Sequence, residues 1–205
     1  MTIDLWLRGF VIGLAIAAPV GPIGVLCMRR TLNTGRLAGF VTGLGAAVAD
    51  GVYGAIGAFG TALAALLIDR QEWIATVGGI FLLWLGIAGM RRPPAEINAA
   101  PSRGAVDLAG YFGSTFLLTL ANPATILSFA AIFASVGLGS TPDAGSALQL
   151  VAGVLLGSAA WWLFLSLAVG AVRHRLGAIA TAWINRISGL VLVGFGLWAL
   201  WIAWG

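Results

Sequence analysis

A single acidic residue, Asp50, lies in the middle of a long apolar stretch. Its nearest charged neighbours in the chain are Arg36 and Asp69, and most residues between them are Ala, Gly, Leu or Val. A carboxylate at the centre of a membrane helix costs about 2.5–3.5 kcal/mol on insertion scales, so one is rarely kept there without a function. Such a group can exchange a proton or hold a cation. The alternative is a structural carboxyl group that accepts a hydrogen bond from a neighbouring helix.

Two proline-containing segments interrupt apolar runs, at residues 18–24 (Ala-Pro-Val-Gly-Pro-Ile-Gly) and 119–125 (Thr-Leu-Ala-Asn-Pro-Ala-Thr). Proline has no backbone N–H and clashes with the preceding turn. The carbonyl groups freed by each proline need protein, water or a ligand as partner when lipid surrounds the helix. A kink that only shapes packing is the alternative for each break.

Because the two breaks lie at corresponding places in the chain, we predict that they and Asp50 form one binding or coupling site. Tyr53 lies on the same helix face as Asp50, three residues on, where it can orient the carboxyl group, contact a ligand or only pack. The residues expected at the site are Pro19, Gly21, Pro22, Asp50, Tyr53, Asn122, Pro123 and Thr125.

The composition restricts what can carry such a site. Of the 205 residues, 60% are hydrophobic and 9% are charged, with a mean hydropathy of +1.01. A soluble domain has about 45–50% apolar and roughly 25% charged residues, so a water-soluble globule is excluded. A spanning helix takes about 20 residues, and the chain therefore has room for about six. The apolar runs lie at about Trp6–Met28, Leu37–Ile68, Trp73–Met90, Leu108–Val136, Ser146–Val172 and Ile187–Trp204.

The arginines predict an orientation in the membrane. The first, third and fifth connections between the runs hold three arginines each, whereas the second holds only Arg70 and the fourth holds none. By the positive-inside rule the odd-numbered connections are cytoplasmic. Six spans then put both termini outside the cytoplasm, with Arg8 as the one exception to the bias. The nine arginines are at positions 29, 30, 36, 91, 92, 103, 173, 175 and 186.

The rest of the polar inventory argues against several functions. No basic stripe with interleaved aromatic residues is present, so nucleic acid is not an expected partner. The lone Cys27 and the lone His174 offer no disulfide, zinc motif or nucleophile–base pair. We therefore expect no catalytic residue, metal site or cofactor. In the fifth run, Trp161-Trp162 can form a cavity wall or pack in the core, and two small-x3-small spacings predict close helix packing, at Gly39/Gly43 and Gly153/Gly157.

The two halves of the chain resemble each other. Three spans are an odd number, so a second copy would be inserted upside down, and inverted repeats with broken helices are typical of secondary transporters. We predict an all-α membrane protein of six transmembrane helices in two inverted three-helix repeats (residues 1–90 and 108–205), with helices one and four broken and a cytoplasmic linker at 91–107. A shift of 101 residues pairs Gly9-Phe10 with Gly110-Tyr111 and Pro22 with Pro123, and a shift of 110 pairs Trp73-Ile74 with Trp183-Ile184, Gly79 with Gly189 and Gly86 with Gly196.

The segment 18–30, the stretch from Gly35 to Asp50 and the segment 119–123 together resemble the lysine-exporter (LysE/RhtB-type) amino-acid translocator family, in motif order and over essentially the whole chain. That family typically carries a Pro-Gly-Pro-like element in helix one, an acid in helix two and Asn-Pro-Lys in helix four. This sequence departs from the pattern twice. It reads Pro19-Val20-Gly21-Pro22, with one extra residue, and has Ala124 where lysine is common.

The resemblance implies a multi-pass protein of the inner (cell) membrane that exports amino acids or similar small metabolites. It implies coupling to the proton gradient, with a proton or another cation as coupling ion, and it leaves a homodimer open. A channel or a non-transporting membrane subunit is the main alternative, although the mostly Ala, Leu, Gly and Val spans offer a channel no continuous polar path. A membrane-embedded enzyme is a weaker alternative.

Overall fold

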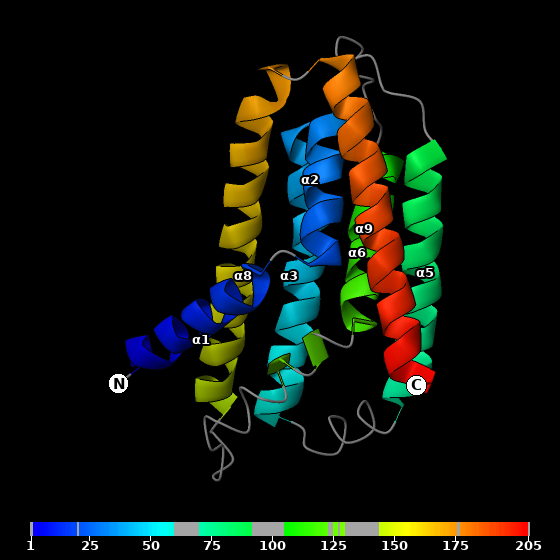
Figure 1. The fold of residues 1–205 in the computed structure, drawn as a ribbon. Coiled ribbons are helices and arrows are strands. Elements are labelled where there is room, and N and C mark those ends of the chain that lie inside the picture. Colours follow the sequence, from blue (N-terminus) through cyan, green and yellow to red (C-terminus); the bar gives the residue numbers. More distant parts are fainter. Residues whose placement is uncertain are drawn as a thin grey trace.

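The computed structural model describes residues 2–19, 21–59, 70–91, 105–122, 125–126, 128–129, 144–175 and 177–204 (Figure 1). Within these ranges the regular structure is helical throughout, as predicted. The helices are α1 (Thr2–Ala17), α2 (Pro22–Thr34), α3 (Arg36–Phe59), α5 (Gln71–Arg91), α6 (Ala105–Leu120), α8 (Ala144–Val172), the short 3₁₀ helix η1 (Arg173–Arg175) and α9 (Ala178–Trp204).

Several of these helices suit a membrane. By length and composition α3, α8 and α9 can each cross a bilayer, and the bent pair α1–α2 would make a further crossing. The apolar part of α5, Glu72–Ala88, is shorter. Large apolar side chains are exposed along the outer faces, among them Trp84 at 61% and Leu190 at 61%. Lipid is the environment in which such faces are stable, so the chain is a multi-pass membrane protein.

The first apolar run is broken where its prolines predict. The helices α1 and α2 meet at an angle of 78° (Figure 1). Gly21 is the N-cap of α2, with an extended backbone and no side chain to cap the helix, and Pro22 occupies the first turn. Proline fits that position because an N–H there has no partner within the helix in any case.

Arginines of all three predicted cytoplasmic connections lie in helices instead. Arg29 and Arg30 belong to α2, Arg91 is the last residue of α5, and Arg186 belongs to α9. Arginine is a good helix former, so charge alone does not end a helix. The helix α2 ends at Gly35, whose φ of 122° lies in the region that an L side chain rarely adopts. A single glycine therefore makes the turn between α2 and α3, and the predicted connection around it is much shorter than expected.

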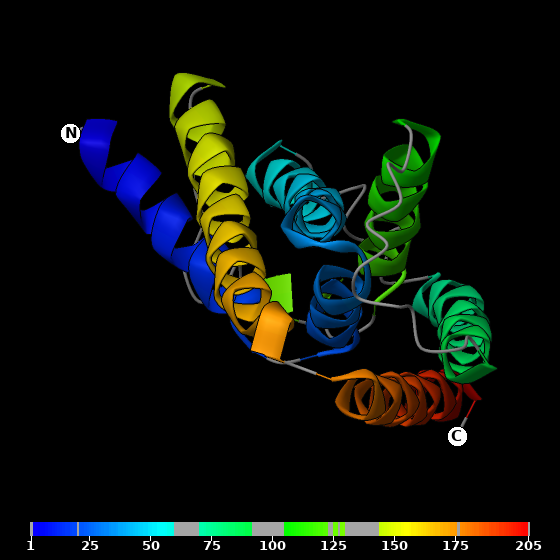
Figure 2. The ribbon, with the colours of Figure 1, turned by 90° about the horizontal axis from the view of Figure 1, so that it is seen from above.

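Viewed from above, α2 lies in the middle of the bundle (Figure 2). It contacts α3, α6, α8 and α9, and its residues from Pro22 to Cys27 are buried. The main apolar core gathers around it and includes Leu26, Leu118 and Leu192. The break between α1 and α2 is thereby held at the centre of the molecule.

Glycines set two close helix crossings, of which the first lies at the predicted Gly153/Gly157 spacing. A Cβ atom on Gly153 of α8 would overlap the backbone of α1 at Trp6, and one on Gly157 would overlap it at Phe10. At the crossing of α5 and α9, a Cβ on Gly79 would lie 2.9 Å from the carbonyl oxygen of Gly196. A contact this short forces the neighbouring backbone to move, so these helices approach as closely as glycine alone allows.

Candidate functional site

A cavity of about 60 Å³ lies where α1 turns into α2. A single water needs roughly 10–15 Å³ by this measure, so the cavity accommodates a small polar group with room to spare. Its wall comes from α1, α2, α3, α6 and α8 and the segments after α1 and α6. The lining residues are Ile16, Ala17, Pro19, Gly21, Pro22, Ile23, Gly24, Ala46, Asp50, Thr119, Asn122, Thr125 and Trp162.

Most of the residues expected at the site meet at this cavity. Pro19, Gly21, Pro22, Asp50, Asn122 and Thr125 all line it, although they come from three separate parts of the sequence. Pro123 lies outside the described residues. Tyr53 is not among the lining residues, and its side chain contacts the end of α6 instead.

Asp50 is nearly fully buried, with 3% of its surface exposed. The hydroxyl group of Ser158, on α8, donates a hydrogen bond to its Oδ2 atom over 2.6 Å. The same hydroxyl oxygen accepts a hydrogen bond from the indole N–H of Trp162 over 3.1 Å. Among the described residues that line the cavity, Asp50 is the only one with an ionisable side chain. The carboxyl group is therefore both held by a hydrogen bond and placed where a cationic group can reach it.

The first turn of α2 gives the cavity a wall of hydrogen-bond donors, in contrast to the acceptor oxygens of Asp50. The helix is closed at its start by the hydrogen bond from the Val25 N–H to the Gly21 carbonyl oxygen, at 3.1 Å. The earlier N–H groups of a helix have no partner within it, and the helix dipole places partial positive charge at this end. Ile23 and Gly24 carry such N–H groups and line the cavity. This wall favours an anionic group.

Asn122 follows the last turn of α6 and joins it to the next helical residues. Its backbone carbonyl oxygen accepts hydrogen bonds from the N–H groups of Thr125 and Ile126, at 3.1 and 3.2 Å. Its side-chain amide donates to the hydroxyl oxygen of Thr125 over 3.0 Å. Thr119 lines the cavity while its hydroxyl group donates back to the carbonyl oxygen of Thr115.

Tyr53 stabilises the end of α6. Its hydroxyl group donates to the carbonyl oxygen of Leu120 over 2.6 Å, and its ring stacks on Phe129 with the ring centres 5.4 Å apart. The side chain is buried, with 4% exposed. The Tyr53 hydroxyl group is thus the hydrogen-bond donor for the Leu120 carbonyl group, at the break in the fourth apolar run.

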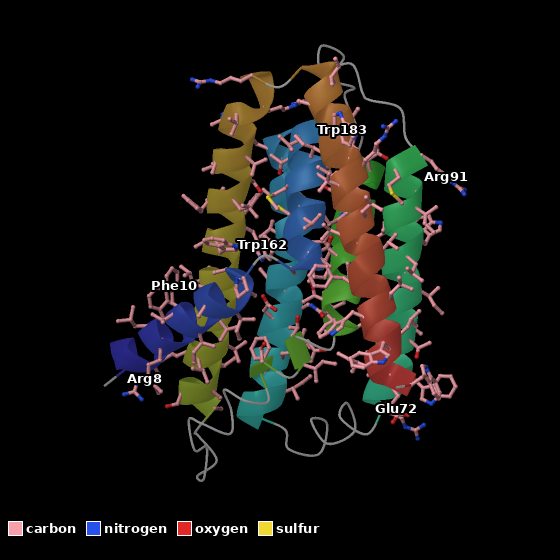
Figure 3. All side chains as sticks on the ribbon, viewed as in Figure 1. Arg8, Phe10, Glu72, Arg91, Trp162 and Trp183 are labelled. Atoms are coloured by element: carbon pink, nitrogen blue, oxygen red, sulfur yellow. The ribbon has the colours of Figure 1, made fainter. Side chains whose placement is uncertain are left out.

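Two residues of α8 complete the site: Ser158, which was not singled out from the sequence, and Trp162, which was expected either in a cavity wall or in the core. The indole of Trp162 lies at mid-height in the bundle (Figure 3) and packs against Gly43, where a Cβ atom would overlap it. Trp162 therefore belongs to the cavity wall and to the core at once. A serine four residues before a tryptophan in a helix of 29 mostly apolar residues is the signal that could have found the pair.

Arg30 is a further residue that the sequence places wrongly, as a loop charge. Its guanidinium group donates to the hydroxyl oxygens of Ser114 and Thr115, at 2.8 and 3.0 Å, and to that of Thr42, at 3.2 Å. It also lies over the ring of Tyr111, 4.6 Å from its centre. Arg30 therefore connects α2 to both α3 and α6. It does so near the C-terminal end of α2, whereas the cavity lies at the N-terminal end of that helix.

Within the described part of the chain, no group of three or more His, Cys, Asp or Glu side chains is arranged to hold a metal ion. Apolar helices, a broken span in their midst and a cavity at the break with one anionic and one electropositive wall define a membrane transport protein. The chain belongs to the LysE type translocator family, which matches residues 14–201. The resemblance seen in the sequence is thereby confirmed, and the protein is a transporter rather than an enzyme.

Three relatives illustrate the family. The chain is 28% identical over 200 residues to a Bacillus subtilis protein named "Putative amino acid efflux protein YcgF", covering 95% of this chain and 94% of the relative. It is 34% identical over 176 residues to the uncharacterized membrane protein YahN of Escherichia coli, covering 83% and 77%. It is 28% identical over 141 residues to the threonine efflux protein of Salmonella typhi, covering 64% and 68%. No solved structure matches the chain.

Proposed function

We propose that this protein is a secondary exporter of amino acids or similar small zwitterionic metabolites, and that the cavity at the α1–α2 break is its substrate site. The observation that carries the proposal is that Asp50 and the first turn of α2 line the same cavity. A zwitterion needs both kinds of partner within one small space. The efflux proteins of Bacillus subtilis and Salmonella typhi support the substrate class and the direction of transport.

The substrate's two charged groups bind to different walls. Its carboxylate accepts hydrogen bonds from the N–H groups of Ile23 and Gly24, where the helix dipole favours an anion, and from the amide of Asn122. Its ammonium group donates to the Asp50 carboxylate. Pro19, Gly21 and Pro22 keep the backbone broken here, as in other transporters whose half-helices end at the substrate. Pro123 has the matching role at the second break, and Thr125 orients Asn122.

Asp50 also couples transport to an ion gradient. A substrate ammonium and a proton compete for the Asp50 carboxylate. When the site faces outside, a proton binds and displaces the substrate, and the protonated site then turns back to face the cytoplasm. This exchange makes the protein an antiporter. The proton is the coupling ion we favour because a carboxyl group with a hydroxyl donor at 2.6 Å offers one site for a proton and few ligands for a metal cation.

We propose six spans in two inverted repeats, with residues 1–90 and 108–205 as the halves and 91–107 as the cytoplasmic linker. Helix contacts support this pairing: α1 packs on α8 as α6 packs on α3, and α5 packs on α9. At the last interface Gly79 faces Gly196 and Gly86 faces Gly189. A shift of 110 residues exchanges these two contacts with each other, as a two-fold relation between the halves requires.

The proposed membrane is the inner (cell) membrane, with the end of the bundle that carries Arg91 in the cytoplasm and both termini outside. Arg91 lies at the opposite end from Glu72 (Figure 3). On α9, Trp183 and Trp204 are exposed and 21 residues apart, which is about 32 Å of helix. Tryptophans prefer the two interfaces of a bilayer whose core is about 30 Å thick.

The test is counterflow in proteoliposomes. Purified protein is reconstituted with an excess of one unlabelled amino acid inside, and the entry of the same labelled amino acid is followed. The panel holds zwitterionic, cationic and acidic amino acids, and protein-free vesicles serve as the control. We expect transient accumulation for zwitterionic members of the panel. Equilibration without accumulation would identify a channel, and no entry of any member would refute a transport function for amino acids.

A further inference from the structure

Ser158 occupies a position behind the cavity wall. Two side chains that line the cavity, Asp50 from α3 and Trp162 from α8, both hydrogen bond to its hydroxyl group. Ser158 itself has 0% exposure and is not among the lining residues. A substrate in the cavity therefore meets Asp50 and Trp162 directly and Ser158 only through them.

The directions of these two hydrogen bonds follow from the groups involved. An indole N–H can only donate, so the Ser158 oxygen must accept from Trp162 over the 3.1 Å that separates them. The one hydroxyl proton of Ser158 is then directed to Oδ2 of Asp50, 2.6 Å away. With Oδ2 engaged in this way, Oδ1 is the carboxylate oxygen left for a group in the cavity.

We propose that Ser158 is a positioning residue for substrate binding, which fixes the Asp50 carboxylate against α8 so that Oδ1 meets the substrate ammonium, with Trp162 fixing the direction of the Ser158 hydroxyl. This inference rests on the proposed function. It differs from a packing role because the chemistry of the hydroxyl group, rather than its volume, is what the arrangement uses.

The chain offers a matched control for Ser158. Ser166 lies on the same helix, is equally buried at 1% exposure, and faces Cys27 with Oγ and Sγ 3.7 Å apart. It is not among the residues that line the cavity or contact Asp50. If substrate affinity falls whenever a buried hydroxyl group of α8 is removed, the variants of both serines lose affinity. If it falls because Asp50 is no longer positioned, only the Ser158 variants lose affinity.

The experiment measures KM and the maximal rate of counterflow for Ser158→Cys, Ser158→Ala, Ser158→Thr and Ser166→Ala. Cysteine keeps the shape of serine but is a weak donor. A hydrogen bond to a charged group is worth about 1.5–3 kcal/mol, so we expect KM to rise about tenfold or more in Ser158→Cys. The maximal rate and the melting temperature stay close to those of the parent protein. Ser158→Thr, which keeps the hydroxyl group, restores KM toward the parent value, and Ser166→Ala leaves it unchanged.

A normal KM in Ser158→Cys, with an active parent protein, would overturn the role of Ser158 and leave the proposed function intact. Equal losses in Ser158→Cys and Ser166→Ala would also overturn it, in favour of a packing role. If Ser158→Ala does not fold, the cysteine variant alone decides. A parent protein that transports no amino acid would overturn the function and this inference together.

Discussion

The hydroxyl group of Tyr53 lies 2.6 Å from the carbonyl oxygen of Leu120, at the residue where α6 ends. The two residues are 67 positions apart, and their contact joins α3 to the break in the fourth apolar run. A carbonyl group released by a helix break inside a membrane must find another donor. Tyr53 supplies it, and this explains why the tyrosine follows Asp50 without lining the cavity.

Tyr53→Phe should therefore lower stability without changing substrate affinity. The variant keeps the ring against Phe129 but leaves the Leu120 carbonyl group without the tyrosine hydroxyl, at a cost of about 1–3 kcal/mol. The measurement is the melting temperature in detergent together with KM for counterflow. A raised KM at unchanged melting temperature would instead place Tyr53 at the substrate.

Asp50→Asn should abolish accumulation driven by a pH gradient, while exchange of labelled for unlabelled substrate continues at a raised KM, because an amide is a weaker partner for the substrate ammonium than a carboxylate. The amide cannot carry a proton between the two sides, whereas exchange needs no net proton movement. The measurement compares both activities in the same proteoliposomes. If Asp50 only holds the substrate ammonium, both activities fall together, and retained pH-driven accumulation would leave Asp50 with a structural role.

Asn122→Ala should impair transport while the protein is still produced and folded normally. The Asn122 amide is proposed to meet the substrate carboxylate, and its loss should raise KM several-fold. Asn33 is the matched control because it forms a reciprocal amide pair with Asn185, at 2.7 and 3.3 Å, away from the cavity. Asn33→Ala should lower the melting temperature and leave KM near the parent value. The reverse pattern would remove Asn122 from the site.

Gly153→Ala should weaken the crossing of α1 and α8. The added methyl group would overlap the backbone at Trp6, and overpacking of this kind costs about 1–3 kcal/mol. Gly194→Ala, on α9, is the control because a Cβ atom there meets nothing within 4 Å. Melting temperatures of the two variants in the same detergent should differ clearly. Equal stability would mean that the helices separate without cost.

Arg30→Lys should destabilise the bundle although it keeps the charge. The guanidinium group reaches oxygens on both α3 and α6, from Thr42 to Ser114 and Thr115, and an ammonium group cannot span the same set. The exposed Arg91 provides the control substitution, Arg91→Lys, which should have no effect on melting temperature. A fully stable Arg30→Lys protein would show that the charge alone is needed.

The sequence predicts the helical membrane class, the break in the first run and six of the thirteen residues that line the cavity. These are local properties. In lipid each spanning segment must satisfy its own backbone, so apolar length, proline breaks and a lone carboxylate such as Asp50 are visible in the sequence without any knowledge of neighbours. The helical positions of Arg29, Arg30 and Arg186 are the local feature that it misses, because charge marks a membrane boundary but does not end a helix.

Only the tertiary structure shows which side chains from different helices meet. Ser158 reaches Asp50 across 108 positions, and Arg30 reaches Ser114 across 84. No local pattern records such pairs, because they depend on which helices are neighbours and on how each is rotated. Glycines such as Gly43 and Gly153 set those distances by letting backbones and the Trp162 ring approach. The sequence therefore identifies the groups that are able to bind a ligand or carry a proton. Helix packing decides which of them share a cavity, which lie behind its wall and which only stabilise the fold.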